Sequence, residues 1–309
     1  MLIKTAGSLG LLCLFSLTTI TGVAGITAPM ASTYKLSGED LMRIRASTNE
    51  KESTVVQWEG QVLSYKPGEA PAVVFNVLGM NIARAKKSAD GTYDLLAREF
   101  QLYLDPVTSQ VLNVWKNPYS NETVPVVHVA NNPVYQTFPA GQDYVAQARP
   151  GGIYSFQLAI PLSYPNPLNP AGDPNSPMAP YAGTQKFAAI ESFTFTFPAS
   201  EIMSNSKSLP SMQVYWTRTS PLLPFMATPN TNVTLLFIAN GAKVEGGWKN
   251  LKPALRDIID TTLPAYKEAP TERISPGGGV SSWSYFGRPE VFQAYLNGSV
   301  FPLPDPPLN

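Results

Sequence analysis

The stretch that most constrains the fold is 93–104 (YDLLAREFQLYL). Read as a strand, it has apolar residues on both faces, because successive side chains of a strand point in opposite directions. Arg98 and Glu99 stand in its middle, one on each face. This pattern suits a curled sheet whose outside is covered and whose interior holds a cavity. We therefore predict a mainly β, antiparallel, barrel-like or strongly curled sheet with a few short peripheral helices.

Alternating apolar residues predict further strands before and after this stretch. Turn-forming residues at 106–110 predict a hairpin between 93–104 and 111–115. Short helices are predicted at 37–45, 251–263 and 289–296. Seven prolines stud the segment 161–182, which indicates a long ordered loop or lid. The other predicted strands are 54–65, 73–85, 126–132, 153–160, 187–197, 212–218 and 233–239.

Residues 1–24 have the pattern of a secretory signal peptide. Lys4 precedes an apolar run, and Gly22, Val23 and Ala24 form a region of small residues like that before a signal-peptide cleavage site. A transmembrane anchor is the alternative, but serines and threonines dilute the run. We therefore expect residues 25–309 to form a single secreted β-rich domain, extracellular or, in a bacterium, periplasmic, without stable membrane insertion after cleavage.

Charge and cysteine content exclude several classes of function. Cys13 is the only cysteine, so the expected mature chain has no thiol for catalysis, metal binding or a disulfide. Lys4 is the only charged residue in 1–24, which leaves a formal balance of −1 in 25–309. A chain without a basic surplus is not expected to bind nucleic acid. Three triplets match the acceptor pattern for N-glycosylation, at Asn121, Asn232 and Asn297.

Several separated motifs resemble one family of secreted proteins. They are 36–45 (LSGEDLMRIR), 79–84 (GMNIAR), 104–106 (LDP), 115–118 (WKNP) and 126–133 (VVHVANNP). Together they are similar to domain-of-unknown-function family 1838, over most of 35–295. The resemblance implies the fold and export, but no activity. Asn132 stands where the pattern Val-Ala-Asn-Asp-Pro has an acid, so the resemblance implies no acid or metal role for this position.

His128, the only histidine, is the first candidate for catalysis. We expect it to act as a general base, oriented by Glu99 and accompanied by Arg98 as an electrophilic anchor. The alternative is a core histidine that is hydrogen-bonded within the sheet. A single histidine cannot build a familiar zinc site, and no Gly-x-Ser-x-Gly pattern accompanies it. No phosphate-binding glycine motif is present either, so we expect neither a metal nor any other cofactor.

Aromatic residues on the predicted strands suggest a binding site for a small apolar or aromatic molecule. Such rings supply a large contact area with a polar tip. Ordinary core packing is the alternative interpretation for each of them. The residues that we assign to substrate binding are Trp58, Tyr103, Trp115, Asn131 and Trp216.

These observations favour a cofactor-independent enzyme of secondary metabolism that acts on an apolar small molecule, such as a cyclase, an isomerase or a lyase. Two other hypotheses stay open. One is a non-catalytic secreted carrier with the same pocket, and the other is a glycan-binding or cell-surface module. An enclosed cavity with titratable groups would favour the enzyme, and an enclosed cavity without such groups would favour the carrier. Aromatic residues in a shallow outer groove would favour the surface module.

Overall fold

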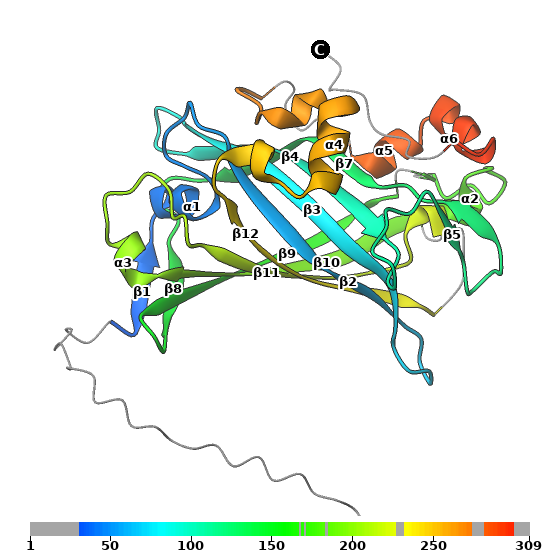
Figure 1. Ribbon diagram of the computed structural model, residues 1–309, viewed down its shortest axis with the longest axis horizontal. Helices are drawn as coiled ribbons and strands as arrows, with labels where there is room; N and C mark the ends of the chain where they lie inside the picture. The colour runs from blue at the N-terminus through cyan, green and yellow to red at the C-terminus, as the bar shows by residue number, and fades with distance from the viewer. Residues whose placement is uncertain are drawn as a thin grey trace, which may run out of the picture. The chain divides into compact units, whose positions relative to one another are not determined.

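The computed structural model describes residues 31–166, 168–169, 171–182, 185–226, 232–273 and 281–299, all of which lie in one of the chain's two units, Ala31–Asn309. Ten strands of these residues form one antiparallel sheet, which curves into a half-barrel (Figure 1). Its order is β1-β8-β9-β10-β11-β12-β2-β3-β4-β7. The bounds are β1 Thr33–Leu36, β2 Thr54–Tyr65, β3 Ala72–Lys87, β4 Tyr93–Leu104, β7 Val129–Phe138, β8 Tyr144–Arg149, β9 Ile153–Pro165, β10 Lys186–Pro198, β11 Gln213–Ser220 and β12 Thr234–Val244.

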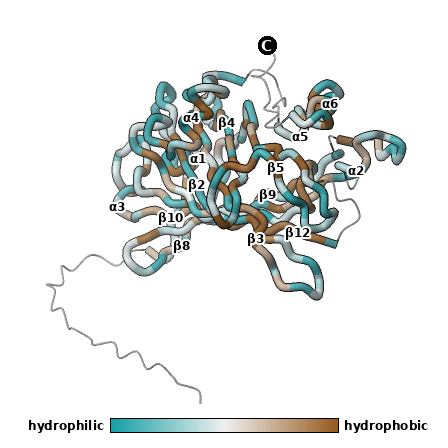
Figure 2. The backbone as a smooth tube through the Cα atoms, turned by 45° about the vertical axis from the view of Figure 1, so that its right-hand side comes forward, coloured by the Kyte–Doolittle hydropathy of each residue, from teal (hydrophilic) through white to brown (hydrophobic). Residues whose placement is uncertain are grey.

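The prediction of a mainly β, strongly curled antiparallel sheet with a few short helices is confirmed. The pairing of β12 with β2 joins the strands of the two halves of the chain into this one sheet. Hydrophobic stretches follow the strands, and hydrophilic stretches gather at the turns (Figure 2). The expected signal peptide at 1–24 lies outside the described residues.

Helices cover the convex face of β2, β3 and β4. They are α4 (Pro253–Thr261), η3 (Pro264–Lys267) and η2 (Gly247–Asn250), and Figure 1 shows α4 over β3 and β4. Leu255 and Ile259 of α4 pack against Phe100 and Leu102 of β4 in one buried cluster. Burying each such side chain contributes roughly 1.5–3 kcal/mol to stability. The covered outside that the 93–104 pattern predicts is therefore present.

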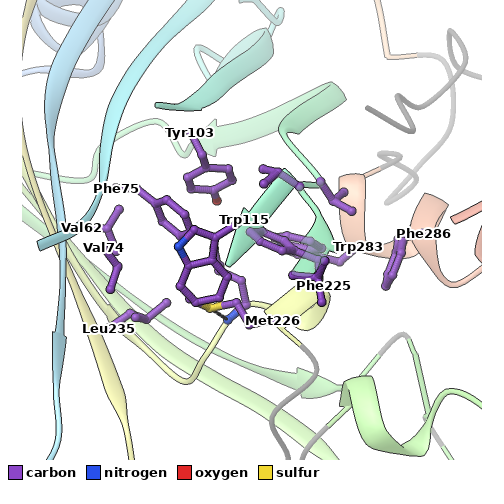
Figure 3. Close-up of a cluster of buried hydrophobic side chains, with 14 of the residues drawn as sticks. Val62, Val74, Phe75, Tyr103, Trp115, Phe225, Met226, Leu235, Trp283 and Phe286 are labelled. Atoms are coloured by element: carbon purple, nitrogen blue, oxygen red, sulfur yellow. Dashed lines mark hydrogen bonds between the residues drawn. The ribbon is translucent and has the colours of Figure 1, made fainter. Parts of the chain in front are cut away.

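A second buried cluster, which we call the aromatic plug, fills one end of the concave side. It combines side chains of the sheet with the short elements β5 (Val114–Lys116), β6 (Thr123–Pro125), η1 (Pro224–Met226), α5 (Ser282–Phe286) and α6 (Pro289–Leu296). The helix α2 (Ala179–Ala182) packs against it. Figure 3 shows its centre, where aromatic rings from these elements meet. The plug includes Phe75, Tyr103, Trp115, Phe225 and Trp283.

The helix α1 (Gly38–Arg45) and the short α3 (Ala199–Ile202) lie at the opposite end of the half-barrel (Figure 1). α1 begins with a capping box, in which the Ser37 hydroxyl accepts from the N–H of Asp40 and the Asp40 carboxylate accepts from the N–H of Ser37. Arg43 of α1 donates all five of its N–H groups. Its acceptors are Asp40 Oδ1 and the backbone oxygens of Glu201, Ile202, Ser204 and Ser206, at 2.7 to 3.2 Å.

The hairpin predicted between 93–104 and 111–115 does not form. β4 pairs instead with β7, and β5 pairs with β6 in a separate small sheet. Only one isolated bridge, between Leu104 and Val111, links β4 to the following segment. The Asp105 carboxylate accepts from the N–H groups of Val107 and Thr108. The turn after β4 is therefore held by hydrogen bonds among its own residues, and the segment that follows does not continue as a strand beside β4.

The proline-rich segment 161–182 is irregular only after its first five residues, because β9 continues through Pro165. β8 pairs with β9 only over Ile153, Tyr154 and Ser155. Beyond them, β9 pairs with β10 alone and forms an edge of the sheet. An edge strand tolerates proline, because the missing N–H would face away from the ladder.

Candidate functional site

β4 sends its two central charges to opposite faces of the sheet. Glu99 lies on the concave face, whereas Arg98 lies on the convex face with the residues that pack against α4. Arg98 donates from Nε to Asn132 Oδ1 at 2.7 Å and from Nη1 to the backbone oxygen of Glu268. Arg98 therefore links the segment after η3 to the convex face of the sheet through a hydrogen bond. The expected grouping of Arg98, Glu99 and His128 does not form.

His128 lies at the end of β4 and is 1% exposed. Its Nδ1 accepts from the N–H of Tyr103 at 3.0 Å, and its Nε2 lies 3.0 Å from the carbonyl oxygen of Leu112. Because Nδ1 accepts, Nε2 carries the proton and donates it to Leu112. Burial lowers the pKa of His128 to about 3, which keeps the ring neutral. These contacts support the alternative of a core histidine that is hydrogen-bonded within the sheet.

Glu99 lies in the middle of the concave face, between two asparagines on neighbouring strands. The side chains of Asn81 and Asn131 donate to its two oxygens at 3.4 and 3.3 Å, because both residues stand opposite Glu99 in the strand register. Burial raises the pKa of Glu99, although Asn131, Arg45, Asn81 and Arg218 all favour its charged form. Its carboxyl group is therefore held in place and is ready to accept or give a proton.

A second carboxyl group, Glu191 of β10, lies on the same face beside Arg218 of β11. The two residues stand opposite each other in the register, and Arg218 Nη1 lies 3.4 Å from Glu191 Oε1. Burial raises the pKa of Glu191, Arg218 opposes this shift, and the charge of Glu99 adds to it. Four strands separate β10 from β4 in the sheet order. The curvature of the sheet therefore brings Glu191 into the electrostatic field of Glu99.

Arg45, the last residue of α1, brings a second guanidinium to this group. It donates from Nη1 to Gln136 Oε1, and it lies over the rings of Phe138 and Phe195 at 5.9 and 5.7 Å. Burial lowers the pKa of Arg45 to about 10, and Glu99 opposes the shift. The side chain therefore stays charged at neutral pH.

We call Glu99, Glu191, Arg45 and Arg218 the concave quartet. Only Glu99 was assigned a role from the sequence. Alternation along 187–197 puts Glu191 on the same face of the strand as Phe193, Phe195 and Phe197, a signal that could have singled it out. Arg45 gave no such signal, because a basic residue in the last turn of a helix is explained by the helix dipole alone.

Trp58 lies flat across β3 on the concave face, in a space that a glycine leaves open. A Cβ atom added at Gly79 would lie 2.3 Å from Trp58 Cε2, so any side chain there would displace the indole. From this position Trp58 Nε1 donates to Gln101 Oε1 at 2.9 Å. The ring therefore forms part of the concave surface beside Glu99.

The structure separates the residues assigned to substrate binding into two groups. Trp58, Asn131 and Trp216 lie on the concave face and are partly exposed. Tyr103 and Trp115 belong to the aromatic plug and are 1% and 8% exposed. The plug holds them through ring contacts, such as the one between Phe75 and Trp115 at 5.2 Å (Figure 3). For these two residues, core packing explains the position.

The concave quartet retains surface that water can reach. Glu99 and Arg45 are partly exposed, and the side chains of Arg218 and Glu191 are 16% and 20% exposed. A water-sized molecule can therefore touch these groups, although they lie deep between the plug and α1. The charged groups and the two tryptophans on the concave face are thus each partly exposed.

A separate cleft of about 750 Å³ lies at the end of the sheet where β2 begins and β12 ends, next to η2. Lys243 and Trp248 contribute to its lining. Lys243 donates to the backbone oxygens of Arg43 and Ala46 and to Ser208 Oγ at 2.7 to 2.8 Å, and Lys267 covers the Trp248 ring at 4.7 Å. Both side chains already have partners within the protein, so we favour the concave face as the functional site.

The three asparagines of the glycosylation triplets, Asn121, Asn232 and Asn297, are all exposed. Within the described ranges, no helix has the length and apolar character required to cross a membrane. In the same part of the chain, no three histidine, cysteine, aspartate or glutamate side chains gather closely enough to hold a metal ion.

Comparison with known proteins identifies a family. No curated protein matches the sequence. A family model described as "Protein of unknown function (DUF1838)" matches residues 51–290, which include the strands β2 to β12 and therefore Glu99, Glu191 and Arg218. The chain belongs to this family.

Proposed function

We propose that the protein is a cofactor-independent enzyme. It catalyses an isomerisation, a cyclisation or an elimination of a small apolar molecule that binds on the concave face of its sheet. One observation carries this proposal. Two partly exposed carboxyl groups whose ionisation is opposed by burial, Glu99 and Glu191, lie within the electrostatic influence of arginines. Paired titratable groups in such surroundings are typical of acid/base catalysis.

In this proposal Glu99 moves the proton. Asn81 and Asn131 hold one oxygen each, so the carboxyl group keeps one orientation toward a substrate. A carboxyl group with a raised pKa is a better general base at neutral pH than an ordinary one, and its protonated form can return the proton. His128 takes no part, because both of its ring nitrogens are engaged by backbone groups.

The arginines stabilise negative charge that develops on a substrate oxygen. Arg45 and Arg218 both act on the electrostatics of Glu99, so an enolate formed by proton transfer to Glu99 would lie within their field. Fixed charges in a partly desolvated site stabilise such an oxyanion without reorganisation. Trp58 and Trp216 offer apolar contact for the body of the substrate.

Kemp elimination of 5-nitrobenzisoxazole tests the proposal. A base removes the carbon-bound proton, the N–O bond breaks, and a coloured cyanophenolate forms, so no cofactor is required. We expect Glu99→Gln to lower kcat/KM by about 100-fold, the usual scale for loss of a general base, with an unchanged melting temperature. The wild-type rate should rise with pH through the raised pKa of Glu99, because only the carboxylate accepts the proton.

The matched control is Glu59→Gln, since Glu59 lies on the same sheet but is exposed and paired with Lys252. This variant should keep the wild-type rate. No elimination above the buffer background, or equal rates for the Glu99 and wild-type proteins, would refute the catalytic proposal. The carrier alternative would then remain. The surface-module alternative has less support, because Trp58 and Trp216 lie on the concave face rather than on the outside.

Secretion remains part of this proposal, supported by the pattern of residues 1–24 alone. Amino-terminal sequencing of the protein from its native source tests it. A mature protein that begins near residue 25 would support export with cleavage, whereas one that retains residues 1–24 would favour the membrane anchor.

A further inference from the structure

The Arg218 guanidinium is left without a full set of hydrogen-bond partners. Within the described residues, its side-chain acceptor is Glu191, at a long distance of 3.4 Å, and its buried Nε has no partner. Arg43, by contrast, places all five N–H groups on acceptors. A buried donor without an acceptor is unfavourable. Arg218 therefore keeps hydrogen-bonding capacity that Glu191 does not fill.

The surroundings of Arg218 are apolar and aromatic. Its guanidinium lies over the rings of Phe187 and Phe237 at 5.5 and 5.8 Å, which hold it in place on both sides. Trp216 precedes it by two residues on the same strand and therefore on the same face, and Phe193 stands opposite Trp216 in the register. Both are partly exposed. A cation and an accessible aromatic surface thus lie side by side.

We propose that the ligand of the concave face carries an acidic group, such as a carboxylate or an acidic enol, that binds Arg218, and a flat apolar body that lies on Trp216 and Phe193. The planar guanidinium can donate two parallel hydrogen bonds to such a group. This inference rests on the site of the proposed function, but it concerns recognition, not proton transfer.

Two fluorescent dyes with the same aromatic body provide the test. 8-Anilinonaphthalene-1-sulfonate is an anion, whereas N-phenyl-1-naphthylamine is neutral. We expect the wild-type protein to bind the anionic dye about tenfold more tightly, the scale of one charge-assisted hydrogen bond. Arg218→Gln should abolish this preference and leave the affinity for the neutral dye within about twofold.

Arg218→Lys keeps a cation beside Glu191 but loses the planar fork, so it should retain part of the preference. It decides the test if the glutamine variant does not fold. Arg256→Gln is the charge-matched control, because Arg256 is 41% exposed on α4, and it should bind both dyes as the wild type does. Equal binding of the two dyes by the wild type, binding of neither, or an unchanged preference in both Arg218 variants would overturn the inference.

Binding of the dyes is measured without turnover. An Arg218-dependent preference can therefore stand even if Glu99→Gln leaves Kemp elimination unchanged. Conversely, elimination that depends on Glu99 can stand when the dyes bind equally.

Discussion

Arg43 and Arg218 lie in two regions of the same half-barrel and differ in what surrounds their charge. At the α1 end, Arg43 is bonded to four backbone oxygens and to Asp40. In the middle of the concave face, Arg218 has a long contact with Glu191 and a buried nitrogen that has no hydrogen-bond partner among the described residues. The first arrangement connects α1 to the loop after α3. The second makes few hydrogen bonds, and we propose above that its guanidinium binds a ligand.

The difference teaches how to separate structural from functional polar groups in this protein. His128 belongs with Arg43, because backbone groups engage both of its ring nitrogens. We propose that Glu99 and Glu191 belong with Arg218 as functional groups, because they keep accessible surface and their ionisation is opposed by burial. Removal of a structural group should therefore reduce stability, whereas removal of a functional group should chiefly change binding or rate.

The largest effect on stability is expected for Arg43→Met. The variant leaves four backbone oxygens and Asp40 without their donors inside the protein, and loss of one partner from a buried ionic network costs about 3–5 kcal/mol. Urea denaturation measures the free energy of unfolding, with Arg256→Met as the exposed control. A decrease in the free energy of unfolding of less than about 1 kcal/mol would show that Arg43 contributes no more to stability than an exposed ion pair, and would contradict the proposed difference between Arg43 and Arg218.

His128→Gln should lower the free energy of unfolding by about 1–3 kcal/mol at pH 7, because the backbone groups of Tyr103 and Leu112 lose well-placed partners. The effect should also depend on pH. The unfolded histidine takes up a proton near pH 6.5 and the folded one only near pH 3, so wild-type stability falls as the pH drops through this window.

The slope from this residue is about 1.4 kcal/mol per pH unit. Urea denaturation at several pH values measures it, and the glutamine variant should lack this contribution. A variant with wild-type stability and a wild-type slope but reduced Kemp elimination would instead restore His128 as a catalytic candidate.

The smallest effect is expected for Arg218→Met, at about 1 kcal/mol or less. The ion pair with Glu191 is long. The raised pKa of Glu191 lets that carboxyl group become neutral once its partner is gone, so the variant does not leave an uncompensated buried charge. Thermal and urea denaturation measure this change beside Arg43→Met. A decrease in the free energy of unfolding as large as that of Arg43→Met would show that Arg218 chiefly stabilises the fold.

Local patterns along the chain were sufficient for much of the fold. Alternation at 93–104 specified β4 to the residue, and the Ser37 capping box specified the start of α1. Both signals arise within a few residues, so they can be recognised without knowledge of distant neighbours. The pairing of β12 with β2 could not be recognised in this way, because the two strands are far apart in the sequence and their register depends on the curvature of the whole sheet.

The candidate site shows the same division. The sequence by itself determined that Glu99 and Arg98 occupy opposite faces of one strand, and it marked Trp58, Asn131 and Trp216 as residues of the sheet. Only the tertiary structure decided which face is concave, that His128 is enclosed by backbone groups, and that Arg45, Arg218 and Glu191 interact electrostatically with Glu99. The reason is physical: alternation specifies the side of a strand, whereas the electrostatic field at a carboxyl group depends on charges that the curled sheet brings near through space.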